Sequence, residues 1–233
     1  MKLGIFTDSH YSSHEVTCKI RRNNQSLRKI REAYAAFEAE QCDLVICLGD
    51  LTDQEDSHQK EIENLKEIAA VIQSSPLRTI CVMGNHDAIT LSKEEFYSIL
   101  EGCSPENCII DGKQLLFLDA CYYQNGEHYA PGDELSRWID TLYPFADELE
   151  QHLAGTEQDT YVFLHQNIDP NVREDHRLHN SARLFEIFRN SGKVKAVYQG
   201  HYHPGMESEH DGIRYVTFPA MCERENAYFI IHI

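Results

Sequence analysis

Residues 79–87 read TICVMGNHD, a short apolar run that ends in Gly84-Asn85-His86-Asp87. Apolar runs of four to eight residues are typical of buried strands in an α/β sheet. Four other apolar runs also end in acidic or imidazole side chains: LGIF (3–6) before Asp8-Ser9-His10, LVICL (44–48) before Gly49-Asp50, YVFL (161–164) before His165, and VKAVY (194–198) before Gly200-His201-Tyr202-His203. Ligands bind outside the carboxyl ends of such strands. We therefore expect the five segments to converge on one crevice.

The order and spacing of the five segments resemble the calcineurin-like metallophosphoesterase superfamily, whose pattern is Asp-x-His, Gly-Asp, Gly-Asn-His-Asp/Glu, His and Gly-His-x-His. A lone Asp-x-His or Gly-Asp motif is weak evidence for a family, but here five such segments occur in order from Asp8 to His203. The resemblance implies an α/β fold, a four-layer α/β/β/α sandwich of two mixed sheets flanked by helices. A chain of 233 residues is long enough for one well-cored domain, so we expect residues 1–233 to form a single calcineurin-like metallophosphoesterase domain.

Apolar spacing and turn residues predict the remaining elements. Strands alternate with helices in the first half, and hairpins dominate the second half, which favours two sheets with helices outside. The segment 133–153 is expected to be one helix or two, because Pro144 should kink or interrupt it. The other expected elements are helices near 22–40, 62–72 and 93–100, a hairpin of 108–110 and 114–118, and a C-terminal meander of 206–210, 213–218 and 227–233.

Hydrolysis of a phosphate ester needs a nucleophilic hydroxide and compensation of negative charge, and two cations about 4 Å apart supply both. The resemblance implies two metal ions. One would be bound by Asp8, His10, Asp50 and His203, and the other by Asp50, Asn85, His165 and His201. A ligand set of only N and O atoms leaves Mn, Fe and Zn open. For Asp8 or Asp50 alone, capping a helix is the competing interpretation. For His165 alone, the competing interpretation is a buried histidine whose hydrogen bonds are satisfied within the protein. The combination of segments favours metal ligands.

The ligand spacing also predicts local conformation. If the backbone of Asp8-Ser9-His10 and His201-Tyr202-His203 is extended, alternate residues point the same way. Gly49, Gly84 and Gly200 are expected to permit close approach or positive φ at the strand ends.

His86 resembles the family histidine that contacts the phosphate and protonates the leaving oxygen, and Asp87 would orient its imidazole. Two long polar loops, 122–132 and 166–180, are candidates for holding the rest of the substrate. Within them Asn180 and His179 are the candidate substrate-binding residues, and helix capping is the alternative role of Asn180. Tyr122 and Tyr123 could stack on a base, but packing is favoured. The segment 121–145 departs from the family pattern.

Residues 178–180, 200–203 and 212–220 look most like the small bacterial phosphodiesterase branch, which includes class III cyclic-nucleotide phosphodiesterases and manganese-dependent ADP-ribose/CDP-alcohol diphosphatases. The resemblance implies a metal-dependent phosphoesterase that hydrolyses small phosphodiesters or nucleotide derivatives by attack of a metal-bridging hydroxide, with His86 as general acid. A broad phosphomonoesterase or protein phosphatase is the alternative. A non-catalytic interaction protein on the same fold is a further one, disfavoured because every ligand position is filled.

The formal net charge of −17 disfavours a nucleic-acid polymer as partner, because phosphate backbones are held by clustered Lys and Arg. The expected partner is a small phosphorylated molecule, such as a nucleotide. No apolar stretch reaches the length of a membrane span, and the first residues already have strand character instead of a signal peptide, so we expect a cytoplasmic location. The eight cysteines show no C-x-x-C spacing and are expected to be reduced, mostly buried thiols.

Overall fold

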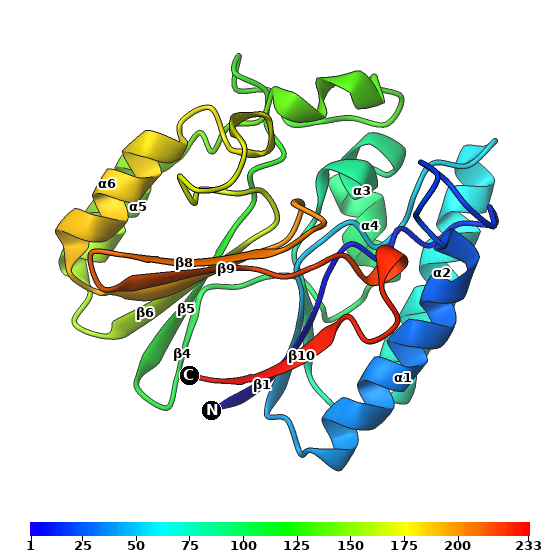
Figure 1. Ribbon diagram of the computed structural model, residues 1–233, viewed down its shortest axis with the longest axis horizontal. Helices are drawn as coiled ribbons and strands as arrows, with labels where there is room; N and C mark the ends of the chain where they lie inside the picture. Colours follow the sequence, from blue (N-terminus) through cyan, green and yellow to red (C-terminus); the bar gives the residue numbers. More distant parts are fainter.

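A computed structural model describes the backbone of residues 1–233 and every side chain except that of Leu135. Two mixed sheets form the centre of the protein (Figure 1). The first sheet has the order β10-β1-β2-β3, with strands β1 (Lys2–Phe6), β2 (Leu44–Cys47), β3 (Thr79–Cys81) and β10 (Tyr228–His232). The second has the order β4-β5-β6-β7-β9-β8, with strands β4 (Cys108–Ile110), β5 (Lys113–Leu118), β6 (Asp159–Leu164), β7 (Val194–Gln199), β8 (Met206–His210) and β9 (Ile213–Thr217).

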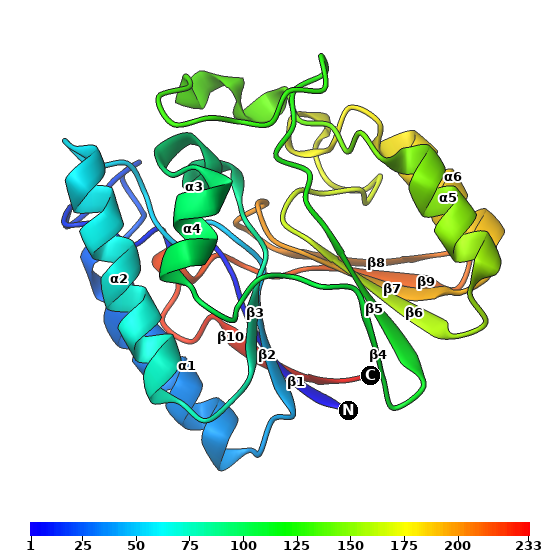
Figure 2. The same cartoon turned by 180° about the vertical axis from the view of Figure 1, so that it is seen from behind.

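Helices cover the outer face of each sheet, as Figures 1 and 2 show from opposite sides. Beside the first sheet lie α1 (Ser26–Ala39), α2 (His58–Ser74), α3 (Asn85–Thr90) and α4 (Lys93–Ile99), and beside the second lie α5 (Ala146–Gly155) and α6 (Ser181–Ser191). Helix α1 packs Ile30, Tyr34 and Phe37 at helical spacing against its sheet, and all three are buried. The expected four-layer α/β/β/α arrangement is confirmed.

The central strands are apolar on both faces because each sheet lies between two other layers. Leu3 and Ile5 of β1 join Phe163 of β6 in the core between the sheets, whereas Phe6 and Val45 face α1 and α2. Such double burial explains why the strands appear in the sequence as continuous apolar runs without polar alternation.

Two expected segments differ from the structure, and a third follows one of its two expected alternatives. The helix expected from residue 22 begins as the short 3-10 helix η1 (Asn23–Gln25) before α1. The segment 133–153 divides into the 3-10 helix η2 (Leu135–Ile139) and α5, with Pro144 between them, which is the two-helix alternative. The single C-terminal meander is wrong: β8 and β9 form a hairpin in the second sheet, but β10 crosses over and pairs antiparallel with β1.

The crossing of β10 has a physical reason. Its alternate residues Phe229 and Ile231 pack into the core between the sheets, while Tyr228 and Ile230 pack against the layer of α1. An apolar strand of this kind needs cover on both faces. A position beside the free edge of β1 lies between the second sheet and α1, so both faces are covered there. Two further 3-10 helices are η3 (Glu174–His176) and η4 (Met221–Glu223).

Parallel pairing brings the functional loops to one end of the sandwich. Strands β1, β2 and β3 run parallel to one another, as do β5, β6, β7 and β9, so the loops after β1, β2, β3, β6 and β7 lie together. All eight cysteines are free thiols. No helix in the described part of the chain is both long and apolar enough to cross a membrane.

Candidate metal centre and active site

The seven side chains expected to bind metal lie together at this end of the sheets, and their polar atoms point to a common centre. His203 Nε2 lies 3.3 Å from Asp8 Oδ1 and 3.2 Å from His10 Nε2. On the other side, His165 Nε2 lies 3.1 Å from Asn85 Oδ1. His165, His201 and Asp50 together form a group of candidate ligand atoms within 4.8 Å of one another.

Asp50 lies between the two groups. Its Oδ2 is 3.5 Å from His10 Nε2 and 3.2 Å from His165 Nε2. Its other oxygen, Oδ1, accepts a hydrogen bond of 2.8 Å from the backbone N–H of His86. One carboxylate oxygen is thus fixed by the protein, and the other faces both groups of ligands.

Hydrogen bonds on the outer side of the site orient the ligands. His165 Nδ1 lies 2.8 Å from the carbonyl oxygen of Leu48, and His203 Nδ1 lies 2.5 Å from Glu223 Oε1. Asp8 Oδ2 accepts hydrogen bonds from the Thr7 hydroxyl at 2.6 Å and from the His201 N–H at 3.0 Å. Metal-binding histidines commonly use the second ring nitrogen in this way, which fixes the tautomer and the ring orientation.

The ligand loops have tight backbone turns, and this differs from the extended backbone expected from the sequence. Asp8, His10, Asp50 and His201 have φ values of 52°, 44°, 52° and 65°. These residues are in the left-handed region, which costs about 1–2 kcal/mol for a residue with a Cβ atom. Buried contacts around the site must hold this conformation. The expectation of simple alternation along an extended strand is therefore wrong.

The glycine expectation is confirmed at all three positions: Gly49 has a φ of 100°, and the other two show close approach. A Cβ on Gly84 would lie 2.2 Å from Asp50 Oδ1, and a Cβ on Gly200 would lie 2.2 Å from the Thr7 hydroxyl and 2.8 Å from Asp8 Oδ2. Only glycine leaves room for the carboxylates that line the site.

The electrostatics of the two buried carboxylates favour a cation between them. Burial alone would raise the pKa of Asp8 and Asp50, but the facing histidines hold both pKa values below the usual range. Asp8 Oδ1 is also buried without a hydrogen-bond partner among the described residues. A buried anionic oxygen of this kind needs a positive partner.

The four imidazoles divide into two kinds. Burial, with the charge of Arg21, lowers the pKa of His10 to about 4, and burial holds the pKa of His201 well below its usual range. Burial also opposes the charged forms of His165 and His203, but carboxylates outweigh it: Asp50 raises the pKa of His165 to about 10, and Asp8 with Glu223 raises the pKa of His203 to about 9. His10 and His201 are thus neutral donors, whereas the neighbouring carboxylates favour the positively charged forms of His165 and His203. The N/O donor set fits divalent cations.

His86 is held by a carboxylate other than the one expected. Its Nδ1 lies 2.9 Å from Asp53 Oδ1, so Asp53 orients the imidazole. Asp87 instead accepts hydrogen bonds from the Thr52 N–H at 3.0 Å and from the Gly84 N–H at 3.0 Å. The expected role of Asp87 is therefore wrong, because α3 begins at Asn85 and its first turn directs Asp87 back to the start of the helix.

A cavity of about 290 Å³ opens above these groups. His86 and His201 line it together with residues that the sequence did not indicate as functional: Cys18, Arg21, Trp138 and His176. Arg21 lies 3.5 Å from Asp53 Oδ2 and 3.5 Å from His10 Nδ1. A signal for Arg21 existed, since a cation close to the first ligand loop of so acidic a chain is a candidate phosphate contact.

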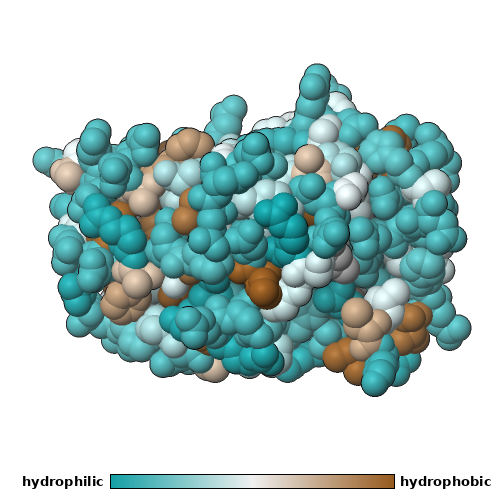
Figure 3. Space-filling view, turned by 90° about the horizontal axis from the view of Figure 1, so that it is seen from above, coloured by the Kyte–Doolittle hydropathy of each residue, from teal (hydrophilic) through white to brown (hydrophobic). Residues whose placement is uncertain are grey.

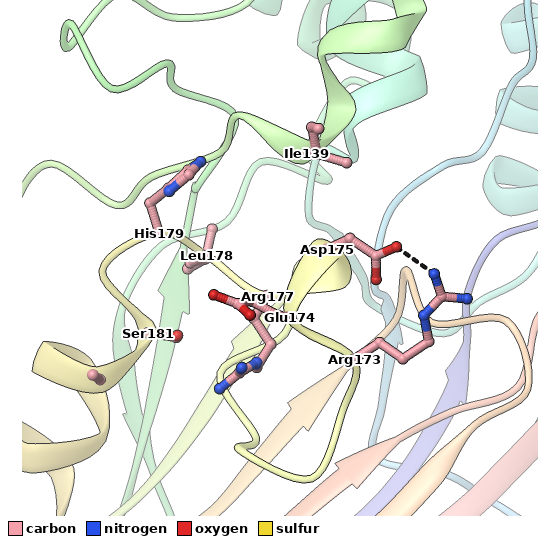
Figure 4. A pocket seen from close by; sticks show the side chains of 9 residues that line it. Ile139, Arg173, Glu174, Asp175, Arg177, Leu178, His179 and Ser181 are labelled. Atoms are coloured by element: carbon pink, nitrogen blue, oxygen red, sulfur yellow. Dashed lines mark hydrogen bonds and ion pairs between the residues drawn. The ribbon is translucent and has the colours of Figure 1, made fainter.

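The two candidate substrate-binding residues lie outside this cavity's lining. The Asn180 amide donates to the Tyr143 carbonyl at 2.7 Å and accepts from the Tyr143 N–H at 3.1 Å. Asn180 precedes α6 but makes no side-chain cap to that helix among the described contacts, so the capping alternative is wrong. His179 lines a neighbouring cavity of about 670 Å³ with Ile139 and Arg177 (Figure 4).

The long loop 122–132 packs on itself instead of entering the cavity. Tyr123 is buried and its ring centroid lies 4.1 Å from that of Tyr129, and the Arg137 guanidinium lies 3.5 Å from the Tyr123 centroid. Packing of Tyr123, the favoured expectation, is confirmed. The loop 166–180 contributes His176 to the cavity.

Comparison with known proteins decides the family. The family model for calcineurin-like phosphoesterases matches residues 1–205. The chain belongs to the calcineurin-like phosphoesterases. Membership of this phosphoesterase family makes the chain an enzyme and implies a dinuclear metal site.

Curated relatives of this calcineurin-like phosphoesterase are bacterial phosphodiesterases. The 3',5'-cyclic adenosine monophosphate phosphodiesterase CpdA of Escherichia coli K12 is 26% identical over 93% of this chain and 74% of its own length. A probable cyclic nucleotide phosphodiesterase of Fibrobacter succinogenes is 23% identical over 93% of this chain and 78% of its length.

A solved structure confirms the fold. A dimetal phosphatase from Danio rerio has a TM-score of 0.85 at 16% sequence identity, covering 100% of this chain and 92% of that one. A Thermus thermophilus protein, TT1561, has a TM-score of 0.62 at 10% identity.

Proposed function

We propose that this calcineurin-like phosphoesterase hydrolyses phosphoester bonds of small phosphodiesters or nucleotide derivatives with two metal ions. Asp8, His10, Asp50 and His203 would hold one ion, and Asp50, Asn85, His165 and His201 the other. The shared position of Asp50 Oδ2, 3.5 Å from His10 and 3.2 Å from His165, carries this assignment. Mn, Fe or Zn suit these ligands.

A bound pair of ions supplies an activated water and neutralises charge on the phosphoryl oxygens. The chain's own residues donate the proton, orient the donor and bind the phosphate. The bond between His86 Nδ1 and Asp53 leaves Nε2 of His86 free, so this nitrogen is the proton donor to the leaving oxygen. Asp53 fixes the orientation of the imidazole. Arg21 on the cavity wall supplies a guanidinium for a phosphate oxygen.

Small substrates are favoured by the cavity and by the relatives. A cavity of about 290 Å³ suits a group of mononucleotide size, and the curated relatives are cyclic nucleotide phosphodiesterases. The net charge of −17 does not favour a polyanionic polymer. A broad phosphomonoesterase is the second candidate, because the dimetal phosphatase from Danio rerio shares the fold.

A substrate panel tests this proposal. Purified protein is assayed with a cyclic nucleotide, a nucleoside diphosphate derivative, chromogenic mono- and diesters and a phosphopeptide, each with Mn²⁺ and with chelator. We expect turnover to need metal and the highest kcat/KM to fall on a diester or nucleotide derivative. Phosphopeptides or simple monoesters that are hydrolysed ten times faster than every diester and nucleotide would contradict the proposal.

A further inference from the structure

Trp138 is the one tryptophan of the chain, and it lies in the wall of the active-site cavity. It belongs to η2, in the segment 121–145 that departs from the family pattern. The same cavity is lined by Arg21, His86 and the candidate metal ligand His201. An indole ring thus borders a space whose other residues are polar or charged.

The contacts of Trp138 leave its ring available for stacking. Its centroid lies 4.8 Å from that of His176 at an interplanar angle of 61°, and 5.3 Å from that of His201 at 60°. Among the described residues no aromatic ring lies parallel to it. Core aromatics of this protein do stack in parallel, as Phe117 and Phe163 do at 22°. Trp138 is also only half-buried.

The segment that carries Trp138 is anchored to the body of the protein. Arg137, its neighbour in η2, stacks on Tyr123, and Tyr123 donates a hydrogen bond of 2.8 Å to Asp133. The Gly132 N–H donates to the carbonyl of Ile89 in α3 at 2.9 Å. An anchored aromatic ring binds a planar ligand with little loss of side-chain entropy.

The arrangement separates two kinds of recognition within one cavity. The ligand cluster and Arg21 supply charge for a phosphate, and Trp138 supplies a planar apolar surface. We propose that Trp138 is the specificity-determining residue of this enzyme and selects substrates that carry a nucleobase by stacking on it. The inference rests on the proposed function and names its substrate class, a nucleotide with a single phosphate at the metal site.

The chain offers a matched control in the next residue. Ile139 also lies in η2 and is 47% exposed, but it faces the neighbouring cavity with Leu178 and His179 (Figure 4). Ile139→Ala therefore removes apolar surface from the same short helix without touching the wall that carries Trp138.

Because the chain has one tryptophan, tryptophan fluorescence reports on this site alone. Metal-loaded enzyme is titrated with AMP and with ribose 5-phosphate, which has the same phosphate and sugar but no base. AMP should quench the emission saturably, and ribose 5-phosphate should leave it nearly unchanged. Ile139→Ala should keep the AMP response. Equal responses to the two ligands, or no response to AMP at concentrations that inhibit hydrolysis, would overturn the proposal.

Inhibition constants give a second readout. Trp138→Ala should weaken inhibition by AMP about 5- to 150-fold, the range for loss of one base–aromatic stack. Inhibition by ribose 5-phosphate should stay the same, and Trp138→Phe should restore most of the AMP affinity. An equal loss for both inhibitors would show that Trp138 only supports the fold. The fluorescence comparison needs no turnover, so its outcome is separate from that of the substrate panel.

Discussion

The floor of the active-site cavity and its rim are built differently. The floor comprises His86 and the seven candidate ligands, which follow strand ends and have their outer atoms fixed, as in the 2.8 Å contact from His165 Nδ1 to Leu48. The rim comprises Cys18, Arg21, Trp138 and His176, which come from loops and 3-10 helices. Strand ends fix side-chain positions accurately enough for metal ligands, whereas the sequence of a loop can vary without moving those ligands. We therefore propose that the floor carries out bond cleavage and that the rim selects the substrate.

The largest expected effect is on the floor at Asp50. Asp50→Ala should lower kcat/KM by at least about 10³-fold, because charge stabilisation by metal ions is worth several kcal/mol. Asp56→Ala, an exposed carboxylate in the following loop, is the control and should be nearly neutral. Steady-state kinetics with a chromogenic diester decide the matter. An Asp50 variant within tenfold of wild type would remove the reason to treat the floor as a metal site.

His86 tests whether the floor also contains the general acid. His86→Ala should lower turnover by about 10²- to 10⁴-fold for a substrate with a poor leaving group, and by less for a nitrophenyl ester, whose leaving oxygen needs less protonation. Metal content, measured in parallel, should stay close to wild type. Equal losses for both substrates would indicate that His86 binds phosphate electrostatically.

Asp53 and Asp87 form a matched pair of buried carboxylates. Asp53→Asn should lower kcat about 10- to 100-fold, because Asp53 orients His86, and should also lower Tm, because Asp53 is buried beside Arg21 at 3.5 Å. Asp87→Ala should mainly lower Tm, because Asp87 accepts the bonds that hold the start of α3. The two variants are compared by kinetics and by thermal unfolding. A loss of kcat in Asp87→Ala together with an unchanged kcat in Asp53→Asn would restore Asp87 as the residue that orients the imidazole.

On the rim, Arg21 should affect binding more than chemistry. Arg21→Met should raise KM about 10-fold, the loss expected for one charged hydrogen bond to a phosphate. Arg22→Met, an exposed neighbour, is the control. A kcat that falls while KM stays constant would place Arg21 with the floor instead.

The smallest effect on activity is expected at Asn180. Its amide makes two hydrogen bonds to the backbone of Tyr143, so Asn180→Ala should cost about 1–3 kcal/mol of unfolding free energy. KM for a nucleotide should stay within about twofold of wild type. Denaturant unfolding measures the first quantity. A KM that rises for nucleotides but not for a chromogenic ester would instead make Asn180 a substrate contact.

The same division explains what the sequence could predict. Apolar runs followed by Asp8, Asp50, Asn85 or His165 identify strand ends locally, and parallel strand ends meet at one edge of a sheet. These local patterns predicted the layers of the fold and the convergence of the floor.

Long-range geometry had no such local pattern. The sheet edge that β10 joins depends on which edge is free, and the carboxylate that faces His86 depends on how α3 is set against the loop after β2. Trp138 and His176 reach the cavity from loops whose path no periodicity describes. Asp53 lies three residues after Asp50, so its proximity to the site could be expected, but its partner could not.

The central claim is that Asp50 joins two metal ions into one catalytic site. Its most direct test is elemental analysis of metal-loaded and dialysed protein, comparing wild type with Asn85→Ala and Asp50→Ala. Since Asn85 belongs to one group of ligands and Asp50 to both, we expect about two ions per chain in wild type, about one in Asn85→Ala and close to none in Asp50→Ala. Full metal content in folded Asp50→Ala would contradict the account.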